Sequence, residues 1–125
     1  TIVQTAELDG VVVVTTPQEV ALIDARKAIG LFERVETPIL GIIENMSYFQ
    51  CPSDGKIYHI FGEGGGEREA AKLGVPLLGK IPLDISTRFG GDEGRPVALE
   101  DPGQNPVSAA FRQVAEQCAR VVLDR

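Results

Sequence analysis

Tryptophan is absent from the 125-residue sequence, which has only one histidine, His59, and two cysteines, Cys51 and Cys118. Two cysteines so far apart form no disulfide framework, so we expect a reducing compartment such as the cytoplasm. No apolar run approaches the roughly 18 residues that a membrane-spanning helix needs. Positive charge is not in excess, because the formal net charge is −6. We therefore expect neither nucleic acid nor a membrane as a partner.

A complete phosphate-binding loop is also missing. Residues 74–80 come close to one, but the motif needs Ser or Thr after its lysine as a magnesium ligand, and Ile81 stands there. The glycine-rich segment 62–66 precedes a predicted helix, yet nearby acidic residues would repel an anion, so we interpret it as a flexible hinge. We expect no ATP hydrolysis from this chain alone. Because Thr1 rather than Met comes first, we expect a fragment or a processed product.

Strand-like and helix-like segments alternate along the chain. Buried strands are predicted at residues 10–15, 39–43 and 75–81, and helices at residues 16–35, 67–73 and 105–123. This alternation predicts an α/β fold with a doubly wound parallel sheet, of which the chain forms an incomplete part. Residues 85–106 are rich in Gly, Pro and Asp and are expected to form a surface loop.

The first predicted helix has a start signal. Thr16 can cap it, Pro17 suits its first turn, and Glu19 stands where a capping box places an acidic residue. Cys118 falls on the apolar face of the last predicted helix, where we expect a buried structural thiol.

A β-hairpin is predicted between the second strand and the second helix. Its strands would be residues 48–50 and 56–61, with Asp54 and Gly55 as a two-residue turn. In that register Cys51 lies opposite Tyr58, and His59 lies opposite Gln50. Cys51 and His59 would then point to opposite faces, which argues against a metal site that they share.

Polar residues follow two of the parallel strands at their C-terminal ends, where open α/β sheets bind ligands. Asn45 ends the second strand, and Pro82, Leu83 and Asp84 leave the third. The amide of Asn45 offers one donor group and one acceptor, which match the N6 and N7 edge of adenine. The alternative for both positions is a turn at a strand end.

Four segments together resemble the C-terminal part of the Mrp/ApbC-type P-loop ATPases, which carry iron–sulfur clusters to recipient proteins. They are residues 15–27, 41–48, 60–66 and 78–84, in the order and spacing of the family. The Glu-Asn-Met-Ser run at residues 44–47 and the cysteine-bearing hairpin distinguish this family from septum-site and partition ATPases. The resemblance implies that residues 1–125 are the C-terminal part of a P-loop ATPase domain, whose phosphate loop precedes this chain.

The resemblance also implies ligands and partners for the complete protein. These are ATP with Mg²⁺, a second copy in a homodimer, and iron–sulfur recipient or scaffold proteins. Asn45 matches the residue that contacts adenine in the family. Pro82, Leu83 and Asp84 match the segment that runs past the base, although a plain strand-end turn explains them equally well.

Cys51 matches the first cysteine of a Cys-x-x-Cys pair that, in the family, holds a [4Fe–4S] cluster between two subunits. Here Asp54 replaces the second cysteine. A carboxylate is a harder ligand than a thiolate, so two copies of this hairpin supply only two thiolates. Either the cluster is labile, or other ligands complete it, or this protein has lost it.

Two rival functions stay open. One is a non-catalytic protein–protein interaction module, which the loss of the second cysteine favours. The other is an ATPase of the septum-site or partition type. The Cys51 hairpin and the lack of a basic amphipathic C-terminal helix argue against the latter.

Overall fold

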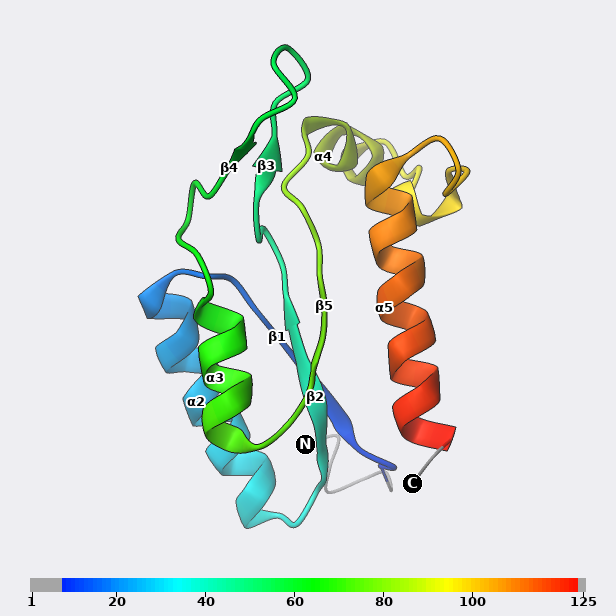
Figure 1. Ribbon diagram of the computed structural model, residues 1–125. Coiled ribbons are helices and arrows are strands. Elements are labelled where there is room, and N and C mark those ends of the chain that lie inside the picture. Colours follow the sequence, from blue (N-terminus) through cyan, green and yellow to red (C-terminus); the bar gives the residue numbers. More distant parts are fainter. Residues whose placement is uncertain (1–7, 124–125) are drawn as a thin grey trace.

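A parallel three-stranded sheet forms the centre of the computed structural model, which describes residues 8–123. Strands β1 (Val11–Thr15), β2 (Ile39–Glu44) and β5 (Leu77–Lys80) lie in the order β1-β2-β5. Helices α2 (Glu19–Arg34) and α3 (Gly65–Leu73) cover one face of the sheet, and α5 (Pro106–Leu123) covers the other (Figure 1). The α/β prediction is confirmed.

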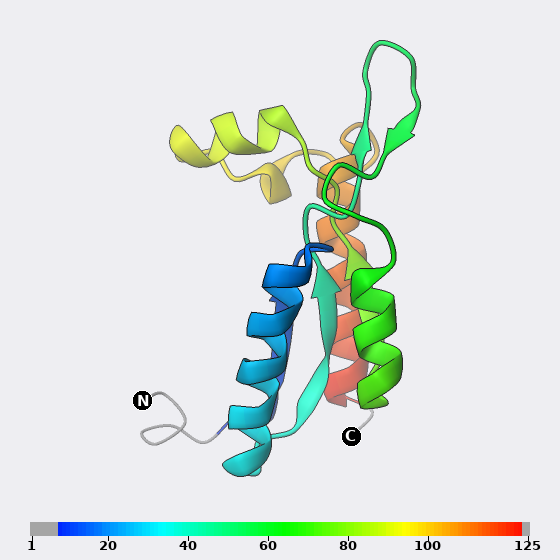
Figure 2. The same ribbon diagram turned by 90° about the vertical axis from the view of Figure 1, so that its left-hand side faces the viewer.

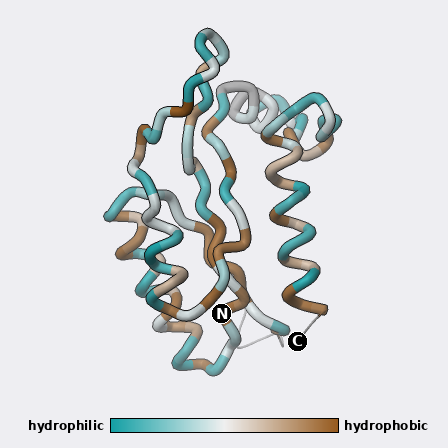
Figure 3. The backbone as a smooth tube through the Cα atoms, viewed as in Figure 1, coloured by the Kyte–Doolittle hydropathy of each residue, from teal (hydrophilic) through white to brown (hydrophobic). Residues whose placement is uncertain are grey.

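The central strands are rich in hydrophobic residues (Figure 3), and each face of the sheet carries a cluster of buried apolar side chains. Ile42 faces α2 and α3 and is fully buried, whereas its neighbour Ile43 faces α5. Burial on both faces explains why β2 is a continuous apolar run rather than an alternating one. Cys118 lies at the edge of the α5 side of the core and is only half-buried, so the prediction of a buried thiol is only partly met.

Helix α2 begins at Glu19, so the predicted start at Thr16 is wrong. The N-cap residue is Gln18, without a side-chain capping bond. Thr16 Oγ1 donates to Gln18 Oε1 at 3.1 Å instead. A Cβ at Gly65 would lie 3.0 Å from the Pro17 carbonyl, so the segment before α2 packs closely against the segment after the hairpin.

The predicted loop at 85–106 is also wrong, since it contains helix α4 (Ile85–Asp92) and the 3-10 helix η1 (Val97–Leu99). Asp84 starts α4, because its Oδ2 accepts hydrogen bonds from Thr87 N at 3.0 Å and Thr87 Oγ1 at 3.1 Å. Val97 is buried in η1, which packs against α5. Asp84 and Pro96 stand at the starts of these helices, whereas Gly90 and Gly91 lie inside α4, so this composition is no sign of an irregular loop.

The hairpin of β3 (Phe49–Gln50) and β4 (Ile57–Tyr58) projects beyond the C-terminal end of the sheet (Figures 1 and 2). Phe49 pairs with Tyr58, and Cys51 N donates to Lys56 O at 2.9 Å. The predicted two-residue turn and register are therefore wrong, because Cys51 lies opposite Lys56. The turn is wider, since Gly55 N donates to Cys51 O at 2.8 Å and Gly55 has φ +69°.

Candidate functional site

Asn45 lies where β2 ends, as predicted. Its backbone N–H donates to Thr15 O of β1 at 2.7 Å, and its side-chain Oδ1 accepts from Met46 N at 2.9 Å. The second of these bonds is the one expected if Asn45 stabilises a turn at the end of the strand. Among residues 8–123 the Asn45 amide nitrogen has no hydrogen-bond acceptor, so it is available to a ligand. Asn45 lines an open groove of about 310 Å³ between the C-terminal end of β1 and α2.

Pro82, Leu83 and Asp84 line a different pocket, of about 280 Å³. Its other walls come from the outgoing stem of the hairpin, Tyr48 and Gln50, and from residues 104–107 at the start of α5. The predicted adenine residues are thus divided between two neighbouring hollows. Residues 104–107 were not predicted to line a site. The sequence indicated only that Asn105 and Pro106 begin a helix.

The backbone of residues 45–48 connects the two hollows, because Asn45 lines one and Tyr48 lines the other. Ile81 N donates to Glu44 O at 2.8 Å, which joins the end of β5 to that of β2. Leu83 N donates to Tyr48 O at 2.7 Å one step further on. The segment that follows β2 is therefore fixed to both neighbouring strand ends before it enters the hairpin.

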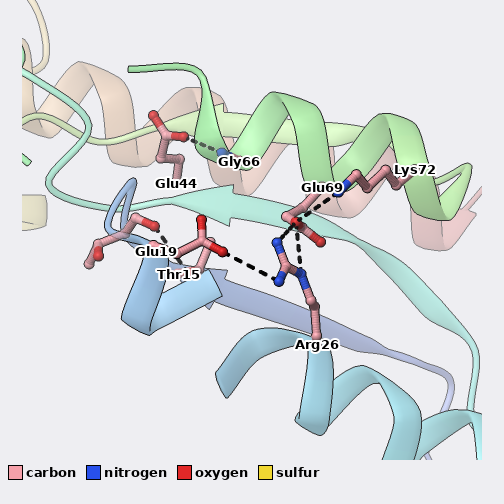
Figure 4. Close-up of polar contacts among 8 residues, drawn as sticks. Thr15, Glu19, Arg26, Glu44, Gly66, Glu69 and Lys72 are labelled. Carbon is pink, nitrogen blue, oxygen red and sulfur yellow. Dashed lines mark hydrogen bonds and ion pairs between the residues drawn. The ribbon is translucent and has the colours of Figure 1, made fainter. Parts of the chain in front are cut away.

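Glu44 is the residue that sequence reasoning missed (Figure 4). Its side chain is only 1% exposed, and it accepts hydrogen bonds from Ser47 Oγ at 2.5 Å and from Gly66 N at 2.6 Å. Gly66 is in the first turn of α3, where free N–H groups and the helix dipole stabilise a buried carboxylate. A glutamate at the end of a buried strand was the only signal in the sequence.

The first turn of α3 is closely packed. Gly65 and Gly66 are buried, and a Cβ at Gly66 would lie 2.6 Å from Glu44 Oε2. Gly62 adopts φ +115°, which side chains rarely allow. The interpretation of residues 62–66 as a flexible hinge is therefore wrong for Gly65 and Gly66, which form the buried first turn of α3.

A second polar cluster joins α2 to α3 (Figure 4). Arg26 binds the buried carboxylate of Glu69 and also reaches Glu19 at 3.5 Å, while Lys72 lies 4.0 Å from Glu69. The hydrogen bond from Arg26 lowers the pKa of Glu69 and raises that of Arg26. Every charge in the cluster has a partner, so the cluster ties the two helices together and is no reaction centre.

At the hairpin tip, Cys51 is half-buried, and both carboxylate oxygens of Asp54 accept hydrogen bonds. Asp54 Oδ1 accepts from Lys56 N at 2.8 Å, and Oδ2 accepts from Tyr58 OH at 2.8 Å. The first of these bonds is the main cause of a lowered Asp54 pKa, and Asp54 raises the pKa of Tyr58. His59 instead lies 3.4 Å from Glu63. Within residues 8–123, no three His, Cys, Asp or Glu residues form a metal site.

The donors at this tip do not fit a four-thiolate cluster, since each hairpin offers one thiolate.

Among the described helices, none is long and apolar enough to cross a membrane.

Comparison with known proteins identifies the family. A model described as ParA, the NUBPL iron-transfer P-loop NTPase, matches residues 1–119. The iron-sulfur cluster carrier protein of Pyrococcus furiosus is 49% identical over 117 residues, which are 94% of this chain and 39% of that protein. The iron-sulfur protein required for NADH dehydrogenase, mitochondrial, of Arabidopsis thaliana is 47% identical over 94% of this chain and 37% of its own length. The chain thus spans less than half of these relatives.

Solved structures agree with this family. A nucleotide-binding protein from Archaeoglobus fulgidus, solved in complex with ADP, is 39% identical with a TM-score of 0.66, over 75% of this chain and 39% of that one. The cell division ATPase MinD of Pyrococcus furiosus is 26% identical with a TM-score of 0.69, over 90% and 43%. The predicted resemblance to P-loop ATPases that carry iron–sulfur clusters is confirmed. The chain belongs to the NUBPL iron-transfer family of P-loop NTPases.

Proposed function

We propose that the complete protein is a cytoplasmic ATP-binding carrier or scaffold for iron–sulfur clusters, and that it acts as a homodimer. This chain would supply adenine contacts and the hairpin that meets its counterpart. The observation that carries the proposal is the position of the Cys51 hairpin, whose stem at Tyr48 and Gln50 lines the same pocket as Pro82 to Asp84. The proposed cluster ligand and the proposed adenine pocket would therefore be neighbours.

For the nucleotide, the residues present fit a base but not its phosphates. Asn45 has a free amide donor, and Leu83 can pack on an aromatic ring. Magnesium and the phosphates would be held by the upstream part of the parent, which would also enable hydrolysis. Val14, on β1 at one edge of the described sheet, is 59% exposed, which supports a parent in which further structure covers this apolar side chain and residues 1–125 form one part of an ATPase domain.

The cluster would be cargo held between two copies of the hairpin. Two Cys51 thiolates would supply half of the ligands of a [4Fe–4S] cluster, and donors from elsewhere in the dimer or from a recipient or scaffold protein would complete the set. Incomplete thiolate ligation would make the cluster easy to hand on.

Iron content tests the proposal. The complete parent is reconstituted anaerobically with iron and sulfide, and iron per dimer is measured for the wild type, Cys51→Ala and Cys118→Ala. We expect iron near four per dimer in the wild type and in Cys118→Ala, and a loss in Cys51→Ala. Equal iron in all three proteins would remove Cys51 from the site.

A second candidate function is a protein–protein interaction module without a cluster. The hydrogen bonds of Asp54 to Lys56 and Tyr58 favour it, because they give the replaced ligand position a structural role. No iron in any of the three proteins would support this function over the carrier.

A further inference from the structure

The Cys51 hairpin is tied on both sides to segments at or next to the proposed adenine contacts. Its outgoing stem is held where Tyr48 O accepts from Leu83 N at 2.7 Å. Its returning segment, residues 59–64, leads into the first turn of α3, where Gly66 N donates to Glu44 Oε2 at 2.6 Å. Glu44 directly precedes Asn45 in the chain. A shift at either strand end would therefore reach the base of the hairpin.

The attachment at Glu44 is the stiffer of the two. Its carboxylate is buried and makes a charge-assisted hydrogen bond to the backbone, and such bonds are strong and short. Ser47 Oγ donates to the other carboxylate oxygen at 2.5 Å, which fixes the side chain on the side of Asn45 as well. A Cβ at Gly66 would lie 3.1 Å from Glu44 Cβ, so little free space separates the two residues.

We propose that Glu44 is a positioning residue that couples a nucleotide at Asn45 to the conformation of the hairpin that carries Cys51. The inference rests on the proposed nucleotide site. Binding energy at Asn45 moves or stiffens the turn at residues 45–47, and the Glu44 carboxylate passes that change to Gly66 and the returning segment. Such coupling is reciprocal, so the state of the hairpin also alters nucleotide affinity.

The test uses the cluster-free complete protein and ADP. The rate at which iodoacetamide alkylates Cys51 is measured by mass spectrometry of the peptide that contains it, without ADP and at ADP saturation for each variant. In the wild type we expect ADP to change this rate by at least about 5-fold, the lower end of typical couplings. In Glu44→Gln, whose amide accepts through only one of its two polar atoms, we expect a ratio near one.

Glu69→Gln is the matched control. It also removes the charge of a buried glutamate bound across two elements, but Glu69 contacts Arg26 and not the end of β2. We expect it to lose stability and keep the ADP effect on Cys51. A merely structural role for Glu44 would make the two variants behave alike. If Glu44→Gln does not fold, Glu44→Asp serves instead, because it keeps the charge but is one methylene too short to hold both partners.

The outcomes separate the inference from the proposed function. An unchanged ADP effect in the folded Glu44 variant overturns the coupling role. ADP binding without any effect on wild-type Cys51 also overturns it, and leaves the nucleotide site in place. A wild-type protein that does not bind ADP overturns the nucleotide part of the proposed function and the coupling with it.

Discussion

Replacing Gly66 with alanine is the sharpest test of the contact between β2 and α3. The added methyl carbon would lie 2.6 Å from Glu44 Oε2 and 3.3 Å from Glu44 Cδ. The carboxylate cannot withdraw freely, because it is buried and its other oxygen is bound to Ser47. The substitution therefore forces the backbone of α3 away from β2, or breaks the hydrogen bond from Gly66 N.

The expected cost combines these effects. Overpacking in a filled interior costs about 1–3 kcal/mol. A hydrogen bond to a charged group contributes about 1.5–3 kcal/mol. Alanine in a helix gains at most about 1 kcal/mol over glycine. The shift of the backbone and the loss of the hydrogen bond can replace one another, so their costs do not simply add. We expect a net destabilisation of about 2–4 kcal/mol.

The measurement is the free energy of unfolding of the complete protein by chemical denaturation. Gly30→Ala is the control, since Gly30 is inside α2 and a Cβ there would meet nothing within 4 Å. That variant should be neutral or more stable by up to about 1 kcal/mol. If Gly66→Ala were as stable as Gly30→Ala, the close packing of Glu44 on α3 would be refuted.

Three further predictions concern ion pairs, nucleotide and cluster. Arg26→Ala should destabilise the protein at neutral pH, since it leaves the buried Glu69 without its partner. Because Arg26 lowers the pKa of Glu69, the ion pair stabilises the protein at pH values above the ordinary pKa range of glutamate, and this stabilisation is lost as the pH falls through the lowered pKa. The unfolding midpoints of the variant and the wild type should therefore converge below about pH 4. Asn45→Ala should weaken ADP binding in calorimetric titration about 5- to 30-fold, the value of one or two hydrogen bonds, and unchanged affinity would contradict the adenine assignment. Asp54→Cys should raise the amount of iron retained per dimer after gel filtration, whereas Asp54→Ser should not; equal retention would show that this position is not a ligand site.

The sequence predicted the sheet and its covering helices because those features follow from local patterns. Residues 39–43 are apolar without alternation, and only a strand buried on both faces has that composition. The helix at residues 85–92 was missed for the opposite reason. Its glycines at positions 90 and 91 and its Asp92 resemble a loop, and only the contact between Asp84 and Thr87 shows that an aspartate caps it.

The hairpin register shows where local turn rules fail. Asp54-Gly55 favours a two-residue turn by its backbone preferences alone. Asp54 instead accepts from Lys56 N and Tyr58 OH, and these side-chain bonds stabilise a wider turn. The bond from Lys56 N is an Asx turn, which local rules include, but the bond from Tyr58 OH depends on the pairing of the two strands and lies outside them.

Glu44 could not have been given its role from the sequence, because its partner Gly66 is 22 positions away. The resemblance marks Glu44 and the glycines as parts of two separate motifs. Folding brings them together, because α3 lies in the connection between the parallel strands β2 and β5 and packs against β2. A buried carboxylate is costly unless its oxygens accept hydrogen bonds. Here the backbone N–H of Gly66 in α3 and the hydroxyl of Ser47 donate them. The glycines therefore leave the space that the Glu44 side chain needs. Glu44 in turn holds the segment after the hairpin to the end of the strand that leads into Asn45. That dependence is why a change at this one side chain is expected to separate nucleotide binding from the behaviour of Cys51.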